Sequence, residues 1–150
     1  MLPHLAKKVL VVDDKECIRT STSLILEEMG YFVRSAEDGL SALAEIRQDS
    51  PDILLTDLNM PGMSGFELLT EVRSLFPAIK VIAMSGAFCG SEIPPGVLAD
   101  AFYQKGGSVS TLLKILRALP RMKCRSLEHP VQVHPSPFGA MQVSLSVKIA

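Results

Sequence analysis

The sequence lacks an excess of charge of either sign. It carries 15 lysines and arginines against 16 aspartates and glutamates, which gives a net charge of -1 at pH 7. A strongly basic chain would attract nucleic acid or an anionic membrane through its electrostatic field, and the composition provides no such field. We therefore expect no direct nucleic acid partner and no membrane partner, so that any partner must be recognised by a particular site.

Long hydrophobic runs and regularly spaced cysteines are also missing. No apolar run approaches the roughly 18 residues that span a bilayer, and residues 1–8 lack the apolar centre of a signal peptide. Cys17, Cys89 and Cys124 do not have the spacing of metal ligands, so we expect reduced thiols. The sequence predicts a cytoplasmic protein, and its 150 residues with 47% hydrophobic content are enough for one packed domain.

Short apolar runs alternate with helical patterns along most of the chain. The runs predicted as strands are Val9–Val12, Tyr31–Ser35, Ile53–Thr56, Lys80–Met84 and Ala101–Tyr103. The predicted helices are Lys15–Met29, Asp38–Arg47 with Leu40, Leu43 and Ala44 facing inward, a helix capped by Ser64 and ended by Pro77, and a helix capped by Ser108. Alternating strands and helices favour parallel sheets joined by right-handed crossovers. We predict an α/β fold of three layers, in which helices cover both faces of a doubly wound, five-stranded parallel sheet.

The same patterns divide the chain into an N-terminal extension over 1–6, a domain over 7–119 and a proline-rich tail over 120–150. The tail ends in "MQVSLSVKIA", whose alternation is a possible strand signal, but a lone strand has no partner here. We expect a mostly disordered overhang, with edge pairing or self-association of this strand as the alternative. No recognisable output domain is expected in the tail. The fourth crossover, over 86–100, is irregular because its prolines and glycines each cost about 1 to 3 kcal/mol inside a helix. We expect at most a short helix around Pro95–Ala99.

Polar residues follow the predicted strands at their carboxyl ends. Asp13 and Asp14 end the first strand, Asp57 the third and Ser85 the fourth, and Lys105 lies just past the fifth. In open parallel sheets such residues converge on one edge, where ligands bind. Two carboxylates about 4 Å apart repel by roughly 4 kcal/mol at an effective dielectric of about 20, so a cation is needed among them.

Lys105 offsets only one of these negative charges, and a divalent ion with oxygen ligands is the simplest further partner. Mg²⁺ suits carboxylates, water and phosphate oxygens, whereas the lack of His and Cys argues against zinc. Carboxylate, Mg²⁺, hydroxyl and lysine together suit the transient phosphorylation of an aspartate. Asp57 would be the nucleophile.

Four motifs resemble the receiver domain of two-component response regulators, of the stand-alone, chemotaxis-regulator-like kind. They are "VLVVDDKE" at 9–16, "DILLTDLNMPGMSGFELL" at 52–69, "KVIAMSGA" at 80–87 and "AFYQKG" at 101–106. The resemblance covers residues 7 to 119, and four motifs in order are far more specific than any one of them. It implies a flavodoxin-like strand order of 2-1-3-4-5.

The resemblance also implies a role for each site residue. Asp57 would be phosphorylated by a histidine kinase, and Lys105 would pair with the phosphoryl group. Mg²⁺ would be bound by Asp57, by Asp14 directly, by Asp13 through water and by the backbone carbonyl of Asn59. Ser85 and Phe102 would form the switch that reports phosphorylation to a downstream protein.

The chain departs from the family pattern after Lys105. Gly106 stands where the family usually has a proline, often with a cis peptide bond that helps to fix the lysine. We expect a more mobile loop there. The irregular fourth crossover also lies on the surface that receivers commonly use for dimers and targets, so a dimer is possible.

Three other functions compete with this one. A relay or phosphate sink would pass phosphate from Asp57 to a histidine phosphotransfer protein, and this alternative stays open. A haloacid-dehalogenase-type phosphatase would need an acid and a threonine where Asn59 and Pro61 stand. A dinucleotide-binding enzyme would need a glycine-rich turn after the first strand, and Asp13 and Asp14 would repel a pyrophosphate. We therefore expect a signalling protein that is not an enzyme.

Overall fold

One five-stranded parallel sheet forms the centre of the fold, in the order β2-β1-β3-β4-β5. The computed structural model describes residues 6–87, 93 and 95–119. Its strands are β1 (Lys8–Val12), β2 (Phe32–Ala36), β3 (Ile53–Asp57), β4 (Lys80–Ser85) and β5 (Ala101–Gln104). Its helices are α1 (Glu16–Glu28), α2 (Gly39–Gln48), α3 (Gly65–Leu75) and α4 (Val109–Ala118). The predicted fold class and strand order are confirmed.

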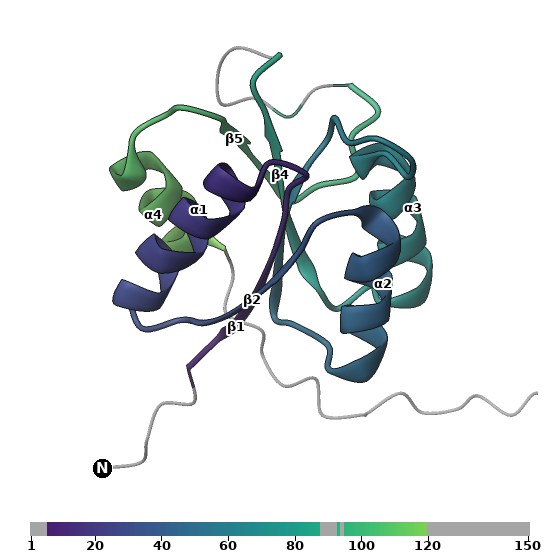
Figure 1. Ribbon diagram of the computed structural model, residues 1–150, viewed down its shortest axis with the longest axis horizontal. Helices are drawn as coiled ribbons and strands as arrows, with labels where there is room; N and C mark the ends of the chain where they lie inside the picture. The colour runs from purple at the N-terminus through teal and green to yellow at the C-terminus, as the bar shows by residue number, and fades with distance from the viewer. Residues whose placement is uncertain (1–5, 88–92, 94, 120–150) are drawn as a thin grey trace, which may run out of the picture. The chain divides into compact units, whose positions relative to one another are not determined.

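Helices cover both faces of the sheet, as Figure 1 shows, with α1 and α4 on one side and α2 and α3 on the other. All residues of the central strand β3 are buried, whereas the edge strands β2 and β5 are partly exposed. Neighbouring residues along each inner strand point to opposite faces. Leu54 therefore packs in the core on the α2 and α3 side, and Leu55 in the core on the α1 side.

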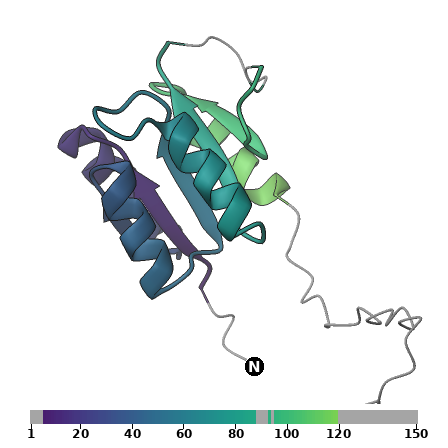
Figure 2. The same ribbon diagram turned by 90° about the vertical axis from the view of Figure 1, so that its right-hand side faces the viewer.

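Side-chain caps start three of the helices. Asp38 accepts a hydrogen bond from the backbone N–H of Ser41 at the start of α2, and Ser108 caps α4 in the same way. Ser64 and Glu67 form a reciprocal capping box at the start of α3. The caps predicted at Ser64 and Ser108 are confirmed, and they fix where the chain turns back after β3 and β5 (Figure 2).

The prediction for the inner face of α2 was partly wrong. Leu43 is buried as predicted, but Ala44 is exposed and Leu40 has 68% of its surface exposed. Ala42 and Ile46 are buried in place of the other two. Leu40 instead lines a surface groove of about 550 Å³ between α2 and α3. None of the predicted site residues lines this groove.

The fourth crossover differs from the other three in the part of it that the structure describes. The short helix allowed around Pro95–Ala99 is not formed, because Pro95 and Gly96 make a turn and the next residues are irregular. Arg73 of α3 holds this segment: its Nε donates to the carbonyl of Leu98 at 3.0 Å and its Nη2 to Oδ2 of Asp100 at 2.8 Å. Hydrogen bonds from Arg73 therefore attach this part of the crossover to α3, where a regular crossover would pack a helix.

Three groups of residues lie outside the described part of the chain, namely 1–5, the crossover residues 88–92 and 94, and 120–150. These ranges include the predicted N-terminal extension except for its last residue. They also include the whole predicted tail with its possible terminal strand. Within the described residues, no helix combines the length and the apolar character needed to cross a membrane.

Candidate functional site

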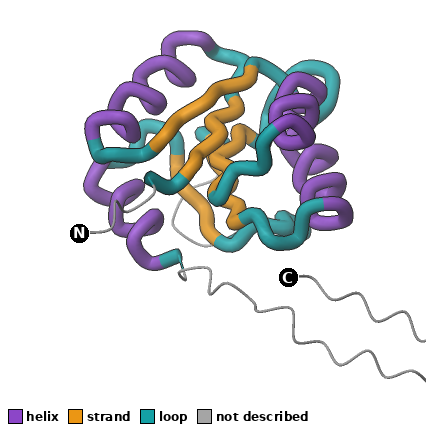
Figure 3. Tube along the Cα trace, turned by 90° about the horizontal axis from the view of Figure 1, so that it is seen from below, coloured by secondary structure: helices purple, strands orange, loops and turns teal. Residues whose placement is uncertain are grey.

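The carboxyl ends of β1, β3 and β4 meet at one edge of the sheet. Figure 3 views the sheet from the opposite end and shows the strands lying between helices on both sides. Their parallel pairing places Val12 beside Thr56, and Asp57 beside Met84. Asp13, Asp57 and Ser85 therefore come together although they are far apart in the sequence. The backbone N–H of Leu58 extends the pairing by donating to the carbonyl of Met84 at 2.9 Å. This is the convergence that the sequence predicted.

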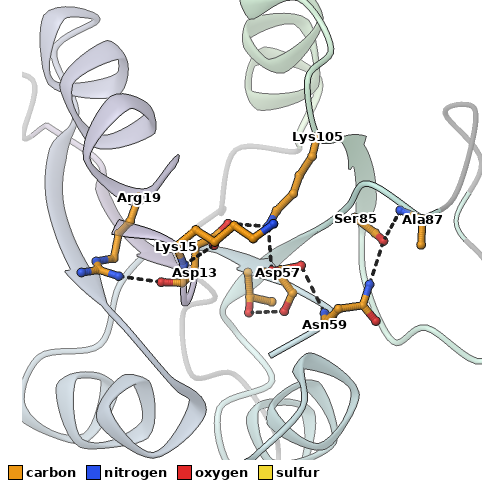
Figure 4. A network of polar contacts seen from close by, with 9 residues as sticks. Asp13, Lys15, Arg19, Asp57, Asn59, Ser85, Ala87 and Lys105 are labelled. Carbon is orange, nitrogen blue, oxygen red and sulfur yellow. Dashed lines mark hydrogen bonds and ion pairs between the residues drawn. The ribbon is translucent and has the colours of Figure 1, made fainter. Parts of the chain in front are cut away.

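An acidic cluster occupies this edge. Asp13, Asp14 and Asp57 each offer an oxygen atom, and these atoms lie within 4.8 Å of one another. Asp13 is fully buried and Asp57 is 3% exposed, whereas Asp14 faces solvent. The Nζ atom of Lys105 lies 2.6 Å from Oδ2 of Asp13 and 2.6 Å from Oδ2 of Asp57. Figure 4 shows the side chain of Lys105 pointing toward both carboxylates. Lys105 thus bridges the two buried carboxylates.

Backbone groups orient the two buried acids. Oδ1 of Asp13 accepts a hydrogen bond from the backbone N–H of Lys15 at 2.9 Å, and Oδ1 of Asp57 accepts one from Asn59 at 3.1 Å. Arg19 of α1 donates from Nη1 to the carbonyl of Asp13 at 2.8 Å. Sequence reasoning missed Arg19, because nothing in its spacing distinguishes it from a surface arginine of α1.

Ser85 is fully buried beside the acidic cluster and linked to it through Asn59. Its Oγ accepts hydrogen bonds from Nδ2 of Asn59 at 3.2 Å and from the backbone N–H of Ala87 at 3.1 Å. Both lone pairs are then engaged, which leaves the hydroxyl hydrogen as the group that Ser85 can donate. Asn59 was predicted only as a carbonyl ligand, and its side-chain bond to Ser85 was missed.

Phe102 is 2% exposed and packs in the core on the α2 and α3 side of the sheet. Phe102 of β5 pairs with Ala83 of β4. Ala83 lies two residues before Ser85 on β4. Val97 of the fourth crossover belongs to the same core. The role of Phe102 in switching stays a prediction.

The donor set fits a hard divalent cation. Among the described residues, Oδ2 of Asp13 is a buried oxygen that makes no hydrogen bond, and Lys105 approaches it only as an ion pair. With one lysine among three acids, the cluster keeps a net negative charge. Carboxylate oxygens without nitrogen or sulfur ligands suit Mg²⁺. Asp13, Asp14 and Asp57 can therefore hold such an ion.

The site shifts the pKa of two of its groups. Burial raises the pKa of Asp57 above 3.8, and the nearby charge of Asp13 adds to this effect, while hydrogen bonds from Lys105 and Asn59 oppose it. Burial lowers the pKa of Lys105, but its interactions with the negative charges of Asp57 and Asp13 outweigh this effect and leave the pKa above 10.5. Lys105 therefore stays charged at neutral pH and favours the ionised form of Asp57.

The raised pKa of Asp57 predicts a pH-dependent stability in the absence of metal. The folded state binds the proton of Asp57 more tightly than the unfolded chain does, so ionising Asp57 lowers the free energy of unfolding as the pH rises above 3.8. We expect metal-free Asp57→Asn to be more stable than the wild type at pH 7. This advantage should shrink as the pH falls toward 3.8. Urea unfolding over this pH range measures it.

Asp49→Asn is the control, because its effect on stability at neutral pH should be opposite to that of Asp57→Asn. A hydrogen bond from Lys8 lowers the pKa of Asp49 below 3.8, so the ionised Asp49 stabilises the fold at neutral pH and loses this effect in acid. We expect Asp49→Asn to be less stable than the wild type at pH 7. An Asp57→Asn variant that is also less stable at pH 7 would show that burial does not dominate at Asp57.

Sequence comparison connects this geometry to a known family. The family described as the response regulator receiver domain matches residues 9–93. The probable transcriptional regulatory protein TcrX of Mycobacterium tuberculosis is 33% identical over 115 residues, which are 75% of this chain and 49% of that protein. The response regulator MprA of Mycobacterium ulcerans is 34% identical over 119 residues, or 78% of this chain and 51% of that protein. The chain thus spans about half the length of these curated relatives.

Solved structures agree with the sequence comparison. The chemotaxis response regulator CheY4 of Vibrio cholerae aligns with a TM-score of 0.66 and 34% identity, over 75% of this chain and 97% of that one. A CheY-like receiver domain protein of Methanospirillum hungatei aligns with a TM-score of 0.67 and 31% identity, over 75% and 91%. This chain belongs to the response regulator receiver domain family, whose members act in two-component signalling.

Proposed function

We propose that Asp57 is the phosphoacceptor of this receiver domain, in a Mg²⁺-dependent reaction with a histidine kinase as the phosphodonor. The proposal rests on the position of Lys105, whose ammonium group lies 2.6 Å from Oδ2 of Asp57 and 2.6 Å from Oδ2 of Asp13. A lysine held between two buried acids is placed to neutralise charge on an incoming phosphoryl group. Ser85 accepts a hydrogen bond from the side chain of Asn59 (Figure 4), and its own hydroxyl hydrogen can be donated to a phosphoryl oxygen.

The transfer forms one bond and breaks one. A carboxylate oxygen of Asp57 attacks the phosphorus atom, while the bond from phosphorus to the imidazole nitrogen of a phosphohistidine breaks and its electrons stay on that nitrogen. Asp57 must be ionised to attack, and Lys105 and the N–H of Asn59 favour that form. After transfer, Lys105 and the hydroxyl of Ser85 can each contact a phosphoryl oxygen.

Mg²⁺ would be held by Asp13, Asp14 and Asp57, with the carbonyl of Asn59 as a further ligand. When bound, it neutralises charge on the phosphoryl oxygens. The chain itself positions the carboxylates: the strand ends place them, and hydrogen bonds from the backbone N–H groups of Lys15 and Asn59 orient them. Because Asp14 is exposed, the metal can enter from the solvent side.

The signal would leave the site through Ser85 and Phe102 to a protein partner. Shifting a two-state equilibrium from 1:99 to 99:1 takes about 5.5 kcal/mol of differential binding. Charge-assisted hydrogen bonds from Ser85 and Lys105 to the phosphoryl group supply roughly 1.5 to 3 kcal/mol each. Together they suffice when both are formed only in the phosphorylated state.

Acetyl phosphate replaces the kinase in the test of this proposal. We expect incubation with acetyl phosphate and Mg²⁺ to add one phosphoryl group, seen by intact mass spectrometry. Asp57→Asn and the metal-chelated wild type should stay unmodified. Modification of Asp57→Asn to the same extent as the wild type would assign the phosphoacceptor elsewhere.

A further inference from the structure

Lys105 lies in a turn of four residues that connects β5 to α4. The backbone N–H of Gly107 donates to the carbonyl of Gln104 at 3.0 Å, which closes the turn. The backbone N–H of Lys105 donates to the carbonyl of Ser85 at 3.0 Å, one step beyond the pairing of Ser85 with Gln104. The backbone of Lys105 is therefore attached directly to the strand end that carries Ser85.

Gly106 gives this turn its shape. Its φ of +83° lies in the left-handed region, which type II turns require at their third position. A Cβ atom on Gly106 would meet nothing within 4 Å, so the backbone conformation alone favours glycine there. Proline, with φ fixed near about -65°, cannot adopt this conformation. The described residues contain no cis peptide bond, so the turn differs from the proline-containing loop that the family resemblance implied.

Tyr103 closes the turn from the side. Its hydroxyl donates to the carbonyl of Gly107 at 2.7 Å, and its ring packs against the core on the α1 and α4 side. A Cβ on Gly107 would lie 2.9 Å from the carbonyl oxygen of Gln104 and 3.3 Å from Cε2 of Tyr103, so the turn and the ring fit closely together. Burial raises the pKa of Tyr103 above 10.0, so its hydroxyl keeps the proton that this bond needs.

A lysine side chain has many rotamers, so its ammonium group is well placed only when its backbone is fixed. Lys105 reaches both Asp13 and Asp57 at 2.6 Å with only 14% of its side chain exposed. We propose that Gly106 and Tyr103 are positioning residues for phosphoryl transfer, which act by holding the 104–107 turn that places Lys105. The proposal rests on the proposed function, because it gives Lys105 the role of contacting the phosphoryl group. The turn would do in this chain what proline does elsewhere in the family.

Gly106→Ala strains the turn without filling any space, and Gly30→Ala is its matched control. Gly30 has φ +88°, and a Cβ on it would also meet nothing within 4 Å, but it follows α1 and forms no part of the site. Both variants should lose similar stability in urea unfolding. We expect Gly106→Ala to slow phosphorylation by acetyl phosphate and Mg²⁺ by about tenfold, since small displacements of a catalytic group have effects of this size or larger. Gly30→Ala should keep the wild-type rate.

Three further variants separate positioning from a general loss of structure. Gly106→Asn should recover most of the rate, because Asn adopts positive φ far more readily than Ala. Tyr103→Phe, which leaves the backbone unstrained, should be slower than the wild type by a few fold. In the Lys105→Met background, Gly106→Ala should cause no further loss of rate, because the residue it positions is gone.

The outcomes distinguish this proposal from the proposed function. A wild type that acetyl phosphate does not modify would overturn the proposed function itself. If the wild type is modified and both Tyr103→Phe and Gly106→Ala are phosphorylated at the wild-type rate, only the role of the turn is overturned. An equal loss of rate in Gly30→Ala and Gly106→Ala would show that stability, and not the position of Lys105, sets the rate. If Gly106→Ala does not fold, Tyr103→Phe decides: a rate equal to the wild type contradicts the proposal.

Discussion

Replacing Lys105 with methionine is expected to impair both stability and phosphorylation. The change removes the only described cation within 4 Å of the buried carboxylates of Asp13 and Asp57. Breaking such a pair leaves uncompensated buried charge, so the free energy of unfolding at pH 7 should fall by about 3 kcal/mol. Losing a group that stabilises charge in the transition state should slow phosphorylation by about 100-fold or more. Urea unfolding and timed phosphorylation with acetyl phosphate measure the two effects.

Lys114→Met is the matched control for this prediction, because Lys114 is an exposed lysine of α4. It should change neither quantity measurably. Adding Asp57→Asn to Lys105→Met should restore part of the lost stability, because one of the two unpaired carboxylates is then removed. A Lys105→Met variant as stable as the wild type would show that water or ions compensate these carboxylates without the lysine.

Gly65→Ala is expected to disturb the site through the backbone. A Cβ on Gly65 would lie 2.2 Å from the carbonyl oxygen of Asp57 and 2.6 Å from Cα of Leu58. Backbone atoms cannot move aside as the end of a side chain can, so α3 must shift away from the end of β3. We expect the free energy of unfolding to fall by about 3 kcal/mol, the upper end of the usual cost of overpacking. Phosphorylation should slow as well, because Asp57 moves with its carbonyl group.

Gly86→Ala provides the comparison for Gly65→Ala. The nearest atom to a Cβ on Gly86 is Cβ of Lys105 at 3.9 Å, an ordinary contact distance. This variant should unfold close to the wild-type urea concentration. If Gly65→Ala and Gly86→Ala were equally stable, the close approach of α3 to the end of β3 would not constrain the fold.

The sequence was sufficient to predict where the main site residues lie. The apolar runs before Asp13, Asp57 and Ser85 identify buried parallel strands, and parallel topology brings the carboxyl ends of neighbouring strands to one edge. Lys105 follows from the same argument, since it comes directly after β5. These predictions depend on strand order and side-chain alternation alone, so they do not require knowledge of packing.

Packing between elements could not be predicted in the same way. The sequence of α2 allows two apolar faces, one with Leu40 and Ala44 and one with Ala42 and Ile46. The packing of α2 against β1, β2 and α3 decides between them. Likewise, Gly65 reads as a turn residue in the sequence, although its lack of a side chain is what lets α3 begin against β3.

Side-chain bonds across the site also needed the structure. The bond from Asn59 to Ser85 spans 26 residues of sequence, and no periodicity relates the two. The bond from Tyr103 to Gly107 depends on a turn that Gly106 permits and the family's usual proline would prevent. The expected mobility of the loop after Lys105 stays a prediction, and the structure adds the hydrogen bonds that close the turn. Whether phosphate passes from Asp57 to a histidine phosphotransfer protein stays a prediction.

Borohydride mapping of the phosphorylated residue is the direct test of whether Asp57 is the phosphoacceptor. Borohydride reduces the acyl phosphate of an aspartate to homoserine, and peptide mass spectrometry then locates the changed residue. After treatment of the full chain with acetyl phosphate and Mg²⁺, we expect homoserine at position 57 and unchanged aspartate at positions 13 and 14. Homoserine at position 13 or 14, or no reduced residue in a sample whose intact mass shows the phosphoryl group, would contradict this prediction.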